Sequence, residues 1–162
     1  MFCAPAEDDG EDFPIIGGPD SLPVLASAVV TFQPNTGFEG ISGSFVFEQI
    51  PTGTRMFGQV TGLSPGKKGT HIHTLGDLRE GCGSTGPHYN PLGQEFEDGN
   101  IGGYIGNLGN IFVDDNGVAD VDRFYENIPL SGPNSVLARS IVIHANPNGG
   151  PRAACGTIGL LE

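Results

Sequence analysis

The chain has 162 residues, a length that fits one domain with a sizeable buried core. Its formal net charge of -12 excludes the classes of protein that bind nucleic acid or anionic membrane surfaces through Lys and Arg. An anionic substrate would gain no long-range attraction from this charge, so it would need a local cation. The sequence has no apolar run of about eighteen residues, so we expect no membrane span.

Residues 1–22 are rich in Asp, Glu, Pro and Gly and are predicted to form an acidic, flexible arm ahead of a domain at 23–162. An acidic contact for a partner is the functional alternative for this arm. The stretch after Met1 lacks the basic and apolar regions of a signal peptide. Two interpretations of Met1 stay open: it is the native start, or the chain is one domain of a longer or multi-domain protein.

Short apolar blocks separated by Gly, Pro and Asn predict about eight strands and no long helix, hence an all-β sandwich or barrel. The first three strands read as an antiparallel meander, and Asp115-Asn116-Gly117 between two alternating runs predicts a hairpin. The other predicted strands follow from period-two alternation or from buried apolar runs. Outside the hairpin, the predicted strands are 28–34, 41–50, 55–63, 70–74, 135–145 and 155–161.

Two connecting segments stand out. Lys67 and Lys68, in SPGKKG, are adjacent cations and are predicted to lie in a solvated turn rather than to guide a substrate. The segment 75–104 has little periodicity, and a structureless connection of this length is usually functional.

The cysteine count is odd. Cys82 and Cys155 lie in Gly-rich segments, whereas Cys3 lies in the acidic arm, so the economical pairing is Cys82 with Cys155. Two buried free thiols are the alternative. A disulfide would fit an oxidising compartment and would tie the long segment to the last strand just before His88.

Three of the four histidines lie within Gly69–Pro91. His71 and His73 alternate in a strand pattern, so both side chains point to one face and can bind one ion. His88 follows a Gly-Pro step, and His144 ends a buried strand. Each histidine alone is better explained as a surface or core residue, but the set predicts a metal site. Imidazole suits Cu, Zn, Fe and Ni, and spacing alone does not separate zinc from copper.

Six motifs, in this order, closely resemble those of the copper/zinc superoxide dismutase family: THIHTLGD, GCGSTGPHYNPLG, IGNLGN, DDNGVADV, SIVIHA and RAACGTIGL. The resemblance runs from about Ala26 to the C-terminus. It implies an eight-stranded antiparallel Greek-key β-barrel, an immunoglobulin-like sandwich, with a long disulfide-tethered loop and a short loop before the last strand. It also implies a copper cofactor, superoxide as the substrate and an extracellular or cell-surface location.

The same resemblance assigns roles to residues. The implied copper ligands are His71, His73, His88 and His144. The family's disulfide matches Cys82 and Cys155, and its active-site arginine matches Arg152. His88 would carry a proton, and the always-charged Arg152 would hold the anionic substrate. A donor that braces the loop is the structural alternative for Arg152, and both roles are compatible.

The chain departs from the zinc-containing members of the family in two places. No histidine follows in the long loop, where the remaining zinc-ligand positions look like Phe96, Tyr104 and Asn107, which do not form the usual zinc shell. Between His144 and Arg152 only ANPNGGP intervenes, in place of a long charged loop. Both departures resemble the copper-only members, so we expect an open, mononuclear copper site without zinc.

Copper-only members keep a carboxylate near the lost zinc ligands. Here Tyr104 lies at that position, while Glu95, Glu97 and Asp98 precede it in the loop. Glu97 or Glu95 is the candidate to fix the tautomer of a ligand histidine, and a solvated acidic loop is the alternative.

The leading hypothesis is a copper-only superoxide dismutase that converts superoxide to oxygen and hydrogen peroxide. A secreted copper-binding or interaction domain of the same fold with little catalysis is the first alternative, and a purely structural sandwich is the second. The presence of all four histidines together with Arg152 favours the enzyme.

Overall fold

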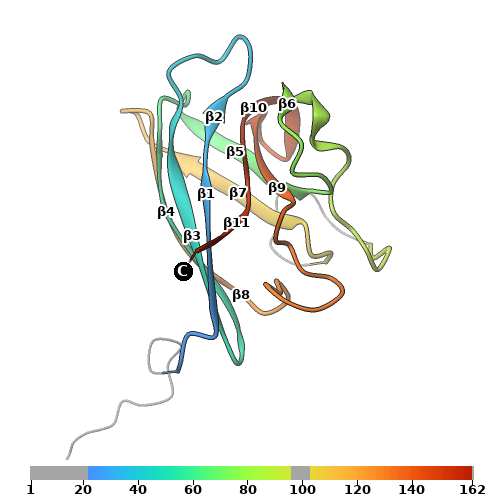
Figure 1. The fold of residues 1–162 in the computed structure, drawn as a ribbon. Helices are drawn as coiled ribbons and strands as arrows, with labels where there is room; N and C mark the ends of the chain where they lie inside the picture. The colour runs from blue at the N-terminus through green and yellow to red at the C-terminus, as the bar shows by residue number, and fades with distance from the viewer. Residues whose placement is uncertain (1–21, 96–102, 162) are drawn as a thin grey trace, which may run out of the picture.

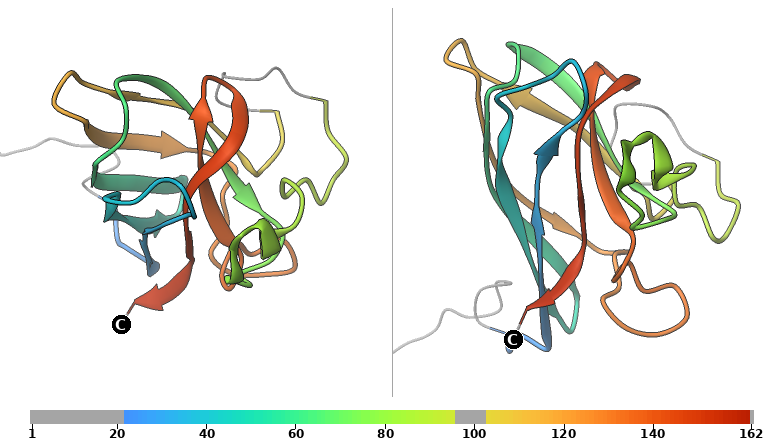
Figure 2. Two further views of the ribbon diagram at one scale, coloured as in Figure 1. Left: turned by 90° about the horizontal axis from the view of Figure 1, so that it is seen from above. Right: turned by 45° about the horizontal axis from the view of Figure 1, so that its top comes forward.

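The computed structural model describes residues 22–95 and 103–161 of the chain. Two five-stranded antiparallel sheets pack face to face, as the predicted all-β fold requires (Figures 1 and 2). Cys3 and almost all of the predicted acidic arm at 1–22 lie outside the described residues. Within the described ranges, no helix is long and apolar enough to cross a membrane.

The first sheet contains the predicted meander. Strands β1 (Ala26–Thr31), β3 (Ser42–Ile50) and β4 (Gly53–Thr61) pair in sequence order. The alternating burial along β3 places Phe45 and Phe47 in the core. The strand order of this sheet is β11 (Gly159–Leu161), β1 (Ala26–Thr31), β3 (Ser42–Ile50), β4 (Gly53–Thr61) and β8 (Val118–Tyr125).

The second sheet carries the residues of the functional site. Its strand order is β2 (Gln33–Pro34), β10 (Gly149–Thr157), β9 (Ser140–Asn146), β5 (Gly66–His73) and β7 (Asn107–Val113). The described part of the long loop between β5 and β7 contains a short strand, β6 (Arg79–Cys82), and a 3-10 turn, η3 (Gly83–Thr85). Among the described residues eight strands are long, as predicted, and β2, β6 and β11 are short additions.

Two short strands close one edge of the sandwich. β2 continues β1 after Phe32, and β11 continues β10 after Ile158, but in both cases the chain changes sheet at that residue. Phe32 and Ile158 are both buried, so the crossings are packed into the core. The sheets are therefore joined as in a barrel at this edge.

The predicted hairpin is only partly correct. Asp114 to Gly117 forms the expected turn, in which Gly117 (φ +80°) donates its N–H to the Asp114 carbonyl at 3.0 Å. Beyond the turn, β7 pairs with β5 in one sheet and β8 pairs with β4 in the other. The turn therefore connects the two layers, because each flanking strand finds its partner elsewhere in the chain.

The predicted solvated turn at Lys67 and Lys68 is only partly correct. Strand β5 begins at Gly66, so both lysines lie in the strand; Lys67 is exposed, whereas Lys68 is buried. Its ammonium donates to the Ser64 hydroxyl at 2.8 Å and to the Ala145 carbonyl at 3.1 Å. These bonds satisfy a charge that would otherwise be costly to bury, and they tie β5 to β9.

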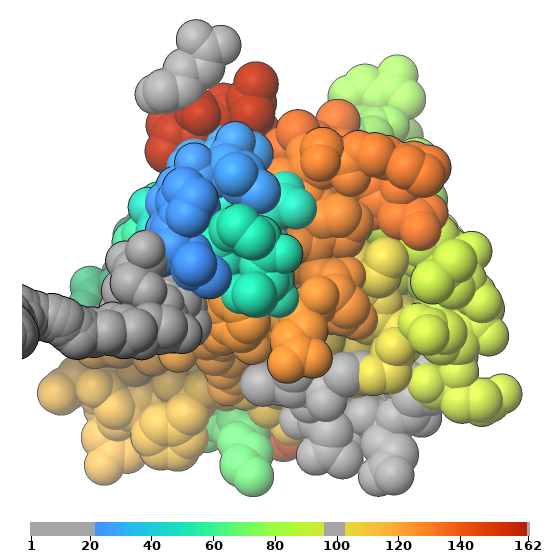
Figure 3. Space-filling view, turned by 90° about the horizontal axis from the view of Figure 1, so that it is seen from below, coloured from blue at the N-terminus to red at the C-terminus, as the bar shows by residue number. Residues whose placement is uncertain are grey.

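The end of the barrel seen from below is built by segments from both sheets (Figure 3). The start of β1, the β3–β4 turn and the connection between β8 and β9 lie together on this face. A cavity of about 530 Å³ is lined here by that turn, by Leu92 and Gln94 of the long loop and by residues 126–129.

Candidate metal centre

The four histidines converge from two adjacent strands and one loop. His71 and His73 lie two residues apart on β5, which places both rings on one face of the sheet, 6.3 Å apart between centroids. His144 comes from the neighbouring strand β9, and its ring lies 5.0 Å from that of His71 and 5.4 Å from that of His73. Strand pairing alone therefore assembles three of the four side chains.

A closed set of backbone hydrogen bonds delivers the fourth. Ile72, between the two strand histidines, donates to Gly106, Gly106 donates to Tyr89, and Tyr89 donates back to Ile72, over 2.7 to 2.9 Å. A Cβ atom at Gly106 would lie 2.5 Å from the Tyr89 carbonyl, so only glycine allows this close approach. The neighbouring His88 ring consequently stacks on His71 at 3.9 Å.

The ligand atoms of these four side chains all lie within 4.8 Å of one another, and in the described part of the chain this is the one group of its kind. Backbone carbonyls fix two of the rings. His73 Nδ1 donates to Gly86 at 2.7 Å, and His144 Nδ1 donates to Gly150 at 2.9 Å. Both rings therefore turn an Nε2 lone pair toward the cluster, where the two Nε2 atoms lie 3.3 Å apart.

In His71 the candidate ligand atom is Nδ1, whereas in His73 and His144 it is Nε2. The Nδ1 atom of His71 is buried and has no hydrogen-bond partner among the described residues. A buried polar atom without a partner is costly, and a lone pair beside two further lone pairs needs a cation. The donor set therefore fits a metal ion bound by His71 Nδ1 and by Nε2 of the other rings.

The electrostatics keep the buried rings neutral. Burial, with smaller contributions from the other imidazoles, lowers the pKa of His71 to about 2. Burial likewise lowers the pKa of His73 to about 3 and also lowers that of His144, and Arg152 adds to both effects. Neutral imidazole is the form that binds metals, so no proton has to leave these rings near neutral pH.

Tyr104 occupies the outer side of His88. Its hydroxyl lies 2.8 Å from His88 Nδ1, and the two rings are nearly parallel. Tyr104 is fully buried, whereas Glu95, the carboxylate considered from the sequence, is exposed. The further candidates Glu97 and Asp98, and Phe96, lie outside the described residues.

Asn107 is buried opposite His71 in the β5–β7 pair, and its Oδ1 accepts the Gly109 N–H at 3.3 Å.

Arg152 lies beside the cluster. It is paired directly with His144 across β9 and β10, and its guanidinium donates to the Cys82 carbonyl at 3.0 Å and to the Thr85 hydroxyl at 2.8 Å. The contact with Cys82 gives Arg152 the loop-bracing role considered from the sequence, while its charge still acts on His73 and His144. Thr85 was not foreseen, because nothing in its local sequence marks it as a partner of Arg152.

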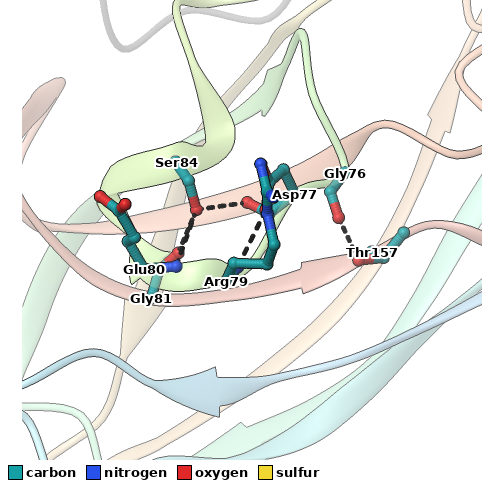
Figure 4. A network of polar contacts seen from close by, with 7 residues as sticks. All are labelled: Gly76, Asp77, Arg79, Glu80, Gly81, Ser84 and Thr157. Atoms are coloured by element: carbon teal, nitrogen blue, oxygen red, sulfur yellow. Dashed lines mark hydrogen bonds and ion pairs between the residues drawn. The ribbon is translucent and has the colours of Figure 1, made fainter.

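The loop that carries Cys82 is braced in three ways. The predicted disulfide joins Cys82 to Cys155, and both cysteines are buried. Within the loop, the Ser84 hydroxyl donates to the Asp77 carbonyl at 2.8 Å (Figure 4). Thr157 donates to the Gly76 carbonyl at 2.9 Å and so attaches the loop to β10. The backbone on which Arg152 and His88 depend is therefore held in place.

The comparison with known protein families agrees with this geometry. The chain matches the family model of the copper/zinc superoxide dismutases (SODC) over residues 41–158, well over half of its length. The matched range includes all four histidines, both cysteines of the disulfide and Arg152.

Proposed function

Because the chain belongs to the copper/zinc superoxide dismutase family, we propose that it is a superoxide dismutase with one copper ion and no zinc. The observation that carries the proposal is the cluster of four histidines, in which the buried Nδ1 atom of His71 has no hydrogen-bond partner in the part of the chain that the structure describes. When bound, copper supplies the redox chemistry: it oxidises one superoxide to dioxygen and reduces a second to hydrogen peroxide. His71, His73, His88 and His144 would hold the ion.

The absence of zinc is supported by the outer nitrogen of His88. A second metal bridged through this ring would need the Nδ1 atom, which lies 2.8 Å from the Tyr104 hydroxyl. The sequence between His88 and His144 contains no further histidine. Phenol and amide side chains at 104 and 107 do not replace the usual zinc ligands.

His88 and Arg152 are the residues we assign to the reaction. His88 is the least buried of the four histidines. Its Nε2 atom, once it no longer holds the ion, could take up a proton and give it to the peroxide product. Arg152 provides a permanent positive charge that holds superoxide in a protein of net charge -12. The second proton of the product comes from solvent.

The wider setting is part of the proposal. The buried disulfide is consistent with an extracellular or cell-surface protein. We propose that residues 1–22 form an acidic arm and that residues 23–162 form the catalytic domain. A chain built in this way can also be one unit of a longer protein.

Substitution of Arg152 tests the assignment. Arg152→Ala should lower the rate of superoxide consumption several-fold while the copper content stays at the wild-type level. Arg55→Ala removes the same charge from an exposed ion pair with Asp122 on the other sheet and should leave the rate unchanged. An unaltered rate in Arg152→Ala would contradict the role of Arg152.

The alternative has its own signature. A fully copper-loaded sample with a type 2 Cu(II) EPR signal and no dismutase activity would make the chain a copper-binding domain of the same fold.

A further inference from the structure

Three segments that are distant in the sequence lie near one another: β2, the loop strand β6 and strand β10 (Figure 1). The side chain of Asn35, the residue after β2, bonds to the other two segments. Its Nδ2 donates to the backbone carbonyl of Arg152 at 2.9 Å. Its Oδ1 accepts the backbone N–H of Cys82 at 3.1 Å. One amide thus joins the two segments that the disulfide also joins.

Both backbone polar groups of Cys82 are used. The N–H bonds to Asn35, and the carbonyl accepts from Arg152 Nη1 at 3.0 Å and from the Thr85 hydroxyl at 2.7 Å. A closed circuit therefore runs from the Asn35 amide through Cys82 to the Arg152 guanidinium and returns through the Arg152 backbone. The acceptor that aims the guanidinium is itself held by Asn35.

The loop is shaped to receive this amide. Gly81 adopts a φ of +66°, and a Cβ atom there would lie 2.6 Å from Asn35 Oδ1. The main chain of Asn35 is fixed as well, because its N–H donates to the Ala153 carbonyl at 2.8 Å. The amide therefore has little freedom to move away from Cys82 and Arg152.

We propose that Asn35 is a positioning residue for Arg152, holding the guanidinium at the orientation that binds the anionic substrate. This inference rests on the proposed role of Arg152. The side chain of Asn35 bonds to the backbone of Cys82 and Arg152 and not to the histidine cluster. The effect of Asn35 on the reaction therefore passes through the arginine.

The test combines single and double variants. In the metal-free protein, Asn35→Ala should accelerate hydrogen exchange of the Cys82 amide measured by NMR. In the copper-loaded protein, the same variant should lower the rate of superoxide consumption about fivefold, the scale of one or two lost hydrogen bonds. The affinity for azide, a small anion used as a probe of the substrate site, should fall by about the same factor. Thr36→Ala, at an exposed neighbouring position, should change none of these.

The double variant separates positioning from general damage. Asn35→Ala in the Arg152→Ala background should cause no further loss of rate or azide affinity. Gly81→Ala, which crowds the amide from the loop side, should reproduce the pattern of Asn35→Ala with the disulfide intact.

Three outcomes would overturn the inference. If Arg152→Ala is impaired but Asn35→Ala matches the wild type, Asn35 does not position the arginine. If the loss caused by Asn35→Ala persists in the Arg152→Ala background, Asn35 acts on overall structure instead. If Arg152→Ala itself is unimpaired, the inference falls together with the proposed role of Arg152.

Discussion

At the scale of single residues, the proposed site without zinc depends on Tyr104. A phenol hydroxyl 2.8 Å from His88 Nδ1 fixes the ring without bringing a second charge. Groups that orient a metal-binding histidine in this way strongly affect metal affinity and activity. Tyr104 was nominated from its position in the sequence, whereas its contact with His88 depends on the path of the long loop.

Removal of this hydroxyl gives a direct prediction. Tyr104→Phe should lower copper affinity or the dismutation rate about tenfold, because His88 loses its orienting partner. Copper titration followed by EPR measures the first quantity, and a superoxide assay measures the second.

Tyr125→Phe is the matched control. Tyr125 is a buried tyrosine of β8 whose hydroxyl donates to the Leu108 carbonyl at 2.9 Å. This variant should lose stability but keep its copper affinity and its dismutation rate. A Tyr104→Phe variant that matches it in both quantities would contradict the role of Tyr104.

Residue chemistry also limited what the sequence could predict. Lys68 lies in a Gly-rich, charged stretch that is typical of a turn, yet its partners Ser64 and Ala145 come from outside its own strand. A buried lysine becomes predictable only when the acceptors around it are known, and strand pairing supplies one of them from a residue 77 positions away.

At the scale of elements, the site depends on how the long loop is fastened to β5. The alternation of His71 and His73 was readable from the sequence, because strand periodicity is local. The backbone hydrogen bonds among Ile72, Tyr89 and Gly106 were not readable from the sequence, because the three residues come from separate segments. Local periodicity therefore predicted that His71 and His73 share one face, and the family resemblance added His88 and His144 to the cluster.

Gly106→Ala tests this fastening. The added Cβ would lie 2.5 Å from the Tyr89 carbonyl and 2.7 Å from the Ile72 carbonyl, so the loop carrying His88 must move away. We expect a loss of about 2 kcal/mol in the free energy of unfolding, measured by urea denaturation, as for other overpacked sites. Copper affinity should fall as well.

Gly83→Ala provides the comparison, because no atom of the described residues would lie within 4 Å of its added Cβ. If both variants bind copper like the wild type, the backbone circuit does not hold His88 in place.

At the scale of the whole molecule, the eight long strands followed from the spacing of apolar blocks and turns. That spacing did not predict two further features: the chain crosses between the sheets at Phe32 and Ile158, and β7 and β8 lie in different sheets. These features depend on which strand pairs with which, and a turn such as Asp114–Gly117 looks the same whether its strands pair or diverge.

The metal-free protein should lose stability as the pH falls below about 6.5, the ordinary pKa of histidine. The folded protein keeps His71 and His73 neutral down to pKa values of about 2 and 3, whereas the unfolded chain takes up protons. Each of these histidines should lower the free energy of unfolding by up to about 1.4 kcal/mol for each pH unit below about 6.5.

Urea denaturation between about pH 6.5 and pH 5 measures this effect. Arg79 and Arg55 lower the pKa values of the Asp77 and Asp122 carboxyls, so these groups change the stability only at a pH below this range. His71→Ala should show a shallower slope than the wild type. A free energy of unfolding that stays constant over the window would contradict this account of the buried imidazoles.

The central claim is that four histidines bind one catalytic copper ion and that no zinc accompanies it. The most direct measurement is the copper and zinc content per chain, joined to the rate of superoxide consumption, for the wild type and His71→Ala. We expect a single copper, no zinc and rapid dismutation in the wild type, with both copper and activity lost in His71→Ala. Stoichiometric zinc, or a fully copper-loaded wild type that leaves superoxide unconsumed, would contradict the claim.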